Sequence, residues 1–187
     1  MTHLSPRQIV AELDRYGDYS MTNPTDHPAA PMPVDLGRVL AELVEEACAG
    51  AIDPRETWIT DPQADMGLLG VCRNLPAERA SQADGHPHTI AGHLNHIRFA
   101  LDFGRGHILG HPSHGDWSTS WQPEQVSQEQ WRQALQRLRE AIDAMQAALR
   151  SVQEWNERRL KHAMTAVAHS AYHLGAVRAR LARQDNR

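Results

Sequence analysis

Several residue types are scarce in this sequence, and each scarcity excludes a class of protein. The 187 residues include two cysteines, Cys48 and Cys72, whose spacing fits neither a disulfide scaffold nor a zinc–thiolate site, so a reduced, cytoplasmic chain is favoured. No apolar run reaches the roughly 18 residues of a transmembrane helix, and no secretory signal peptide is expected. The net charge of −4 argues against a dedicated nucleic-acid binder.

Lysine is also almost absent, whereas histidine is abundant. Lys161 is the one lysine among 19 basic residues, and the chain has 12 histidines. Histidine is the commonest metal ligand, so this excess raises the hypothesis of a metal site. The alternative is surface histidine in a sequence of biased composition. We interpret most histidines between His86 and His114 as loop and surface residues, and a second metal site at His107, His111 and His114 as the less favoured alternative.

The spacing of apolar residues predicts four amphipathic helices. The first covers Val34–Ala49 and is followed by Gly50 as a stop signal. The second begins after Thr89, a favoured N-cap, and three glycines further along leave its end open.

The third and fourth helices have the most regular pattern. Ser127 and Gln130 form a predicted capping box at the start of the third. Apolar residues then recur at alternating steps of four and three from Trp131 to Val152. The same rule holds in the fourth helix from Ala163 to Leu181. Such seams are typical of helices in a bundle.

Four helices and no strand pattern predict an all-α fold, an antiparallel four-helix bundle over residues 34–187. Residues 1–33 are predicted to form an irregular, proline-containing N-terminal arm, in which Ser5–Tyr16 favours a short helix. Residues 51–87 have no sustained period. The predicted organisation is therefore one helical domain preceded by an arm.

Two pairs of histidines in these helices could hold a metal ion. His169 and His173 are four residues apart, so their side chains lie on one helix face, one turn apart, as in helical zinc sites. A third ligand from His93 or His96 of the second helix would complete a three-His site with a position open for water or substrate. Alternatives are that His162 joins or replaces a ligand, or that all are satisfied polar residues at a bundle edge.

Three segments carry a resemblance to a known family. Residues 89–99, TIAGHLNHIRF, resemble the second-helix motif of the DinB-like (YfiT-type) superfamily. Residues 168–178, AHSAYHLGAVR, resemble its C-terminal motif, and the loop 116–121, DWSTSW, resembles a subgroup of it. The likeness covers about residues 35–183.

The resemblance implies an antiparallel four-helix bundle, often a homodimer, with a divalent ion, zinc or nickel, on three histidines. These ligands fall on His96, His169 and His173. Some members are thiol S-transferases that use bacillithiol or mycothiol. One departure is Ala176, where many members have Gln, so a substrate contact carried over from the family is in doubt.

The leading hypothesis is therefore a metal-dependent thiol S-transferase or hydrolase-like enzyme that acts on a small molecule. A non-catalytic metal-binding or stress-response bundle is the first alternative. A metal-free bundle that acts by dimerisation is the second.

Several other residues have expected roles around this site. Candidate partners for the outer imidazole nitrogens are Asp102, Asp116 and Glu157. Trp117 and Trp121 are expected to clamp their loop onto the bundle, and Cys48 to be buried. The basic residues after Leu149 are interpreted mainly as a solvated helix face, with binding of substrate carboxylates as the alternative.

Overall fold

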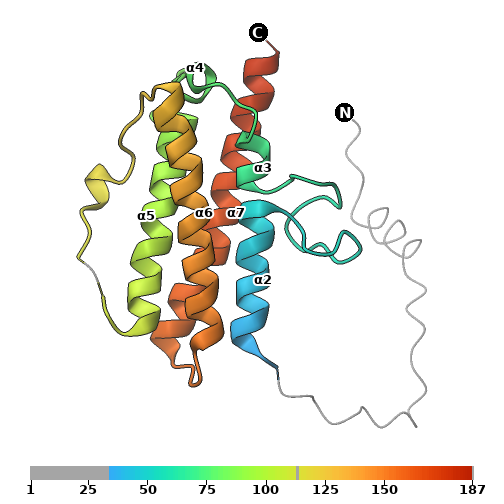
Figure 1. Ribbon diagram of the computed structural model, residues 1–187, viewed down its shortest axis with the longest axis vertical. Coiled ribbons are helices and arrows are strands. Elements are labelled where there is room, and N and C mark those ends of the chain that lie inside the picture. The colour runs from blue at the N-terminus through green and yellow to red at the C-terminus, as the bar shows by residue number, and fades with distance from the viewer. Residues whose placement is uncertain (1–33, 113, 187) are drawn as a thin grey trace, which may run out of the picture. The chain divides into compact units, whose positions relative to one another are not determined.

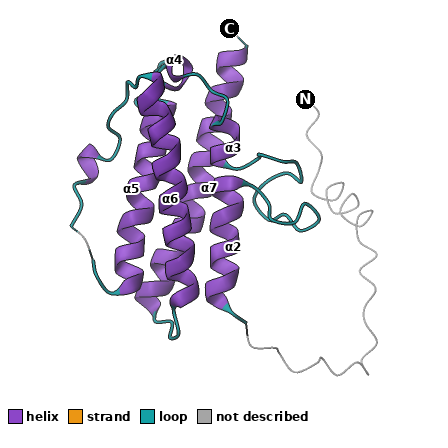
Figure 2. Cartoon of the chain, in the orientation of Figure 1, coloured by secondary structure: helices purple, strands orange, loops and turns teal. Residues whose placement is uncertain are grey.

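The computed structural model describes residues 34–112 and 114–186, and four long helices form its bundle (Figures 1 and 2). They are α2 (Leu36–Ala49), α5 (Ile90–Leu109), α6 (Gln128–Ser151) and α7 (Glu157–Asp185). The connections contain two short helices and a 3₁₀ turn: α3 (Leu68–Cys72), α4 (Ala77–Ala80) and η1 (Trp117–Thr119).

The described residues contain no strand, so the predicted all-α bundle is confirmed. The helices belong to one compact unit, Asp35–Arg187. The predicted arm over 1–33 and its short helix lie outside the described residues. None of the described helices is long and apolar enough to cross a membrane.

Capping side chains set the starts of the helices that carry the histidines and the seam. The Thr89 hydroxyl accepts a hydrogen bond from the Gly92 N–H at 3.1 Å, as its N-cap position predicts. At the start of α6 the predicted capping box of Ser127 and Gln130 is present in both directions. The end of α5, which the sequence left open, lies at Leu109, because Gly110 there adopts the left-handed conformation (φ 83°).

The bundle is arranged so that α5 and α7, the helices with the histidines, pack against each other. Helix α5 also packs against α6, and α7 also packs against α2. Helix α2 in turn contacts α6. In Figure 1, α2 and α7 run one way and α5 and α6 the other. The helices α5 and α6 run in the same direction because the described parts of their connection, residues 110–112 and 114–127, return along the length of the bundle beside α5. That connection brings η1 and the residues after it to α5.

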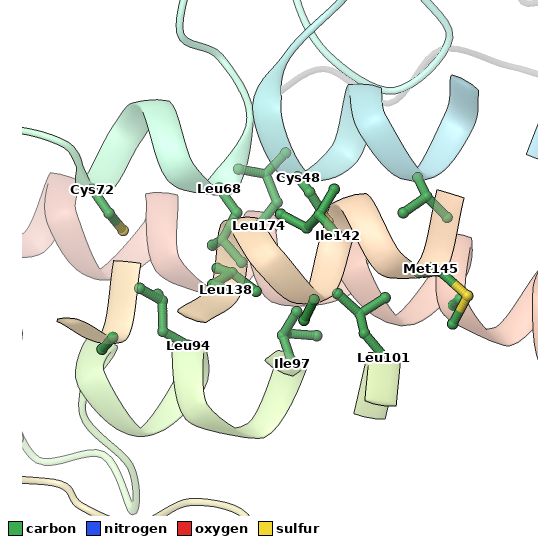
Figure 3. Packing of buried hydrophobic residues seen from close by; sticks show 14 of the residues in the cluster. Cys48, Leu68, Cys72, Leu94, Ile97, Leu101, Leu138, Ile142, Met145 and Leu174 are labelled. Carbon is green, nitrogen blue, oxygen red and sulfur yellow. The ribbon is translucent and has the colours of Figure 1, made fainter. Parts of the chain in front are cut away.

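The core lies between the four long helices and extends under α3 (Figure 3). Leu138, Ile142 and Met145 of the predicted α6 seam are fully buried. Cys48 and Cys72 are free thiols in this core, and burial raises the pKa of each to about 12. The prediction that Cys48 is buried is confirmed, and both thiols stay protonated at neutral pH.

A buried carboxylate organises the loop after α2. Glu46, 4% exposed, accepts hydrogen bonds from the backbone N–H groups of Trp58, Ile59 and Thr60 at 2.8–2.9 Å. Burial by itself would raise the pKa of Glu46, but these bonds and the Thr60 hydroxyl favour the ionised form and hold the pKa below its usual value. The loop is therefore attached to the bundle although it has no regular hydrophobic period.

Candidate metal centre

Three histidine nitrogens converge between α5 and α7. The Nε2 atom of His169 lies 3.2 Å from Nε2 of His96 and 2.9 Å from Nε2 of His173. One ligand atom from each of the three residues lies within 4.8 Å of the others. Two nitrogens of a tetrahedral zinc site are about 3.3 Å apart, given Zn–N bonds of about 2.05 Å. The structure thus brings together the three predicted ligands at a spacing that suits one ion.

A serine from the connecting loop fixes the tautomer of His96. The Ser120 hydroxyl donates its proton to the Trp117 carbonyl at 2.7 Å. It must therefore accept from Nδ1–H of His96, which lies 2.7 Å away. With the proton on Nδ1, the lone pair of Nε2 is left facing His169, as a metal ligand requires.

His93 contacts His173 instead of joining the three nitrogens. The two Nδ1 atoms are 2.7 Å apart, so one ring donates to the other. If His173 donates from Nδ1, its Nε2 is free to coordinate, and His93 serves as its partner. His162 stacks on His107 at 4.2 Å, in another part of the α5–α7 contact. Neither alternative ligand is in the group that the geometry assembles.

The three imidazoles are held in the neutral state. Burial is the main cause, and the neighbouring imidazoles add to it; together they lower the pKa of His96 to about 4 and that of His173 to about 3. Burial also lowers the pKa of His169. Each neutral ring has one proton on two nitrogens, so each ring has a lone pair that it can turn to the Nε2 cluster when its proton is on Nδ1. A cation at this point would satisfy them, and neutral imidazole is the form that binds metal.

A sequence comparison bears on the same residues. The family model of the DinB superfamily matches residues 63–177, a range that contains all three histidines. The chain belongs to the DinB superfamily. No curated protein and no solved structure matches it significantly. The resemblance inferred from the motifs is thus confirmed at the level of the family.

The loop after η1 covers the histidines of this DinB-superfamily chain with an aromatic stack. The Trp121 indole lies between two imidazoles, 3.8 Å from His88 and 3.9 Å from His96, with both pairs of rings nearly parallel. Glu124 holds the other side of His88 at 2.7 Å and also accepts the Thr89 N–H. The stack therefore ties the loop to the start of α5 and restrains the His96 ring.

The predicted carboxylate partners of the imidazoles are wrong. Asp102 pairs with Arg98 at 2.9 Å, Asp116 accepts from Ser118, and Glu157 pairs with Lys161. Each of these carboxylates therefore pairs with a residue two to four positions away in its own helix or loop. The partners in the structure, Ser120 and His93, were missed, because neither a serine in a loop nor a second histidine has a sequence signal for this role.

A cavity of about 480 Å³ opens onto the three histidines. His96, His169 and His173 all line it, together with His93 and Trp121. His86 and His88 line it too; both lie in the loop before α5, as expected, and are partly exposed. No other group of three metal-ligating side chains is found in the described part of the chain, which leaves the second site at His107, His111 and His114 unsupported. The centre thus faces an open cavity.

Proposed function

We propose that this chain holds a divalent transition-metal ion, zinc or nickel, on the Nε2 atoms of His96, His169 and His173. We further propose that it is a metal-dependent enzyme acting on a small molecule, by thiol S-transfer or by hydrolysis. The observation that supports this most is that the three convergent nitrogens all line one cavity. A site of three imidazoles with adjacent space is typical of catalytic metal centres, whereas structural centres are closed by a fourth protein ligand.

A bound ion would supply Lewis acidity, which lowers the pKa of a coordinated thiol or water. In thiol transfer the sulfur forms a bond to the carbon of an electrophile, the bond from that carbon to its leaving group breaks, and the thiol proton passes to solvent. Ser120 contributes by accepting the Nδ1 proton of His96, and His93 would do the same for His173 when that ring coordinates through Nε2. Trp121 covers one face of His96 and keeps water from it.

The test compares metal-loaded wild type with His173→Ala and with His111→Ala, a matched change at an exposed loop histidine. Low-molecular-weight thiols are assayed with a halonitroaromatic electrophile whose thioether product absorbs light. Turnover by wild type and His111→Ala, and none by His173→Ala, is expected. Equal rates in all three proteins would refute catalysis at this centre.

The competing proposals make different predictions in the same experiment. A non-catalytic metal-binding bundle would take up one ion per chain and show no turnover with any thiol or hydrolysable ester. A metal-free bundle would take up none. The cavity beside the histidines favours the enzyme, because a storage or structural site does not need one. A homodimer, which the family resemblance implies, is part of the proposal and is tested by sedimentation equilibrium.

A further inference from the structure

A second cavity, of about 180 Å³, lies between α5 and α7 beside the one that opens onto the three histidines. The two cavities have one lining residue in common, His169. On α7 the second cavity is lined by residues between His162 and Ser170, whereas the first is lined by residues between His169 and Arg183. The two cavities therefore lie end to end along α7, with His169 at their boundary.

The walls of the second cavity are apolar and rich in aromatic rings. Ile97 and Leu101, both fully buried, line it on the α5 side. Three rings line it as well, those of Phe103, Trp117 and His162. The Phe103 ring lies 5.2 Å from the Trp117 ring and 6.1 Å from the His162 ring, in both cases edge to face. Aromatic ligands pack favourably against rings in such arrangements.

The second cavity offers a ligand no charged side chain at neutral pH. The described residues that line it include no Asp, Glu, Lys or Arg. Its two histidines are His162 and His169, and burial is the main cause that lowers the pKa of each. The neighbouring His107 and Arg158 lower the pKa of His162 further. An ionised ligand would lose its water here without gaining an opposite charge, which is costly, so the lining favours an uncharged one.

The size of the second cavity suits a single ring. An apolar cavity of about 150 Å³ is enough to bind benzene in another protein, so about 180 Å³ leaves room for a ring with a small substituent. Thr165 and Trp117, which line the cavity, are exposed, so a ligand can reach it from solvent. Trp117 is 41% exposed, and a bound ring would cover part of its indole. The role of this residue would then extend beyond the clamping of its loop that the sequence predicts.

Ser170 gives the second cavity a polar group. Its side chain is 1% exposed, and its hydroxyl oxygen has no hydrogen-bond partner of regular geometry in the part of the chain that the structure describes. The Cys48 thiol lies close enough to interact with it, but a thiol is a weak partner. A hydroxyl group on a bound ring would be a stronger one, at a place where an unpaired hydroxyl is costly.

We propose that the second cavity is a binding site for a small, uncharged aromatic molecule of one ring, whose phenolic hydroxyl pairs with Ser170. A bound ring contacts His169 and so lies beside the candidate metal centre. Binding of the ring does not need the ion, because none of the other lining residues belongs to the group of three histidines. The site therefore goes beyond the proposed function and is tested independently of it.

The probe is 4-fluorophenol, which is uncharged at neutral pH and is followed by its fluorine NMR signal. It is titrated with the full chain, once after treatment with a chelator and once after loading with zinc. Both forms are expected to bind it with a dissociation constant on the order of 1 mM, a reasonable affinity for so small a ligand. The charged 4-fluorobenzoate is expected to bind at least about tenfold more weakly, because nothing in the lining pairs with its carboxylate.

Two matched pairs of variants locate the bound ring. Ala100→Leu fills the cavity from α5 and is expected to abolish binding, whereas Ala182→Leu adds the same side chain at an exposed position of α7 outside the cavity and keeps it. Trp117→Ala removes one wall and is expected to weaken binding about tenfold. Trp58→Ala removes an indole that is 79% exposed and does not line this cavity, and it leaves binding unchanged.

A further variant tests the hydrogen bond. Ser170→Ala is expected to weaken 4-fluorophenol about fivefold, the effect of one neutral hydrogen bond, and to leave 4-fluorotoluene, which has no hydroxyl, unchanged. Equal binding of 4-fluorophenol by Ser170→Ala and wild type would refute the pairing with this serine.

The outcomes separate this inference from the proposed function. No binding of 4-fluorophenol by wild type at millimolar concentrations, or unchanged binding in both Ala100→Leu and Trp117→Ala, would overturn the site. Binding by the zinc-loaded form alone would overturn it too, because the probe would then be a ligand of the ion. A chain that binds 4-fluorophenol but takes up no zinc would refute the proposed function and support this inference.

Discussion

Replacement of Ser120 by alanine tests how the loop prepares His96 for a metal ion. The serine hydroxyl accepts Nδ1–H of His96 at 2.7 Å because its own proton is committed to the Trp117 carbonyl. In Ser120→Ala the metal-free ring is free to take the other tautomer, with the proton on Nε2. Coordination through Nε2 would then require the tautomer to change back and would leave a buried N–H without a partner.

The expected effect follows from that unpaired group. His96 is 8% exposed, so water cannot readily replace the lost hydroxyl. An unsatisfied buried donor costs about 1–3 kcal/mol, and loss of a partner behind a metal ligand weakens metal binding about 10- to 100-fold. The two magnitudes agree, since a tenfold change is about 1.4 kcal/mol. The free energy of unfolding of the metal-free protein should change less, because the His96 imidazole can move its proton to Nε2 and hydrogen-bond there instead.

The assay is a competition titration for zinc against a chromophoric chelator at neutral pH. Ser118→Ala is the matched control: Ser118 lies in η1, two residues before Ser120, and its hydroxyl bonds to Asp116. Ser120→Thr keeps a hydroxyl and should restore most of the affinity. If Ser120→Ala binds zinc as tightly as Ser118→Ala, the assignment of the His96 tautomer is refuted.

Three further predictions concern stability. Free zinc at about 100 times its dissociation constant should stabilise the native chain by about 2.7 kcal/mol, and a chelator should remove this; a melting temperature equally sensitive to chelator in His169→Ala would contradict the site. Glu46→Gln should cost about 2–3 kcal/mol in urea unfolding at neutral pH because it weakens several charge-assisted bonds. The Glu46 contribution is fully present above the unfolded pKa of 4.5 and is lost as the pH falls through the lower folded pKa, so the deficit should shrink in acid; a deficit independent of pH would refute it. Leu138→Ala, at a fully buried seam position, should cost about 2–5 kcal/mol, and a loss no greater than that of Gln136→Ala on the exposed face would contradict the packing.

The long helices were predictable because local signals and burial agree along each of them. Thr89 and the Ser127–Gln130 box mark helix starts by their own side chains, and the α6 seam is regular for its whole length. The short helices α3 and α4 could not be predicted in this way, because their five and four residues are too few to show a hydrophobic period. The position of the loop that holds Glu46 depends on bonds between residues 12 to 14 apart, which no periodicity encodes.

The candidate ligands were predictable for a similar reason, and their surroundings were not. His169 and His173 are neighbours on one helix, so their spacing alone places them together. Their relation to His96 came from the family motif. Ser120 and Trp121 reach His96 only because the connection from α5 to α6 returns along the bundle, a path that depends on tertiary packing. The two arginines that line the cavity, Arg180 and Arg183, could not be singled out, because the sequence does not show which arginines on α7 face inward.

The central claim is that His96, His169 and His173 hold one ion, and anomalous diffraction from crystals grown with zinc tests it most directly. The account predicts one anomalous peak per chain, within coordination distance of the three Nε2 atoms and open to the cavity. Absence of a peak there from fully loaded crystals, or a peak at other histidines such as His107 and His162, would contradict it.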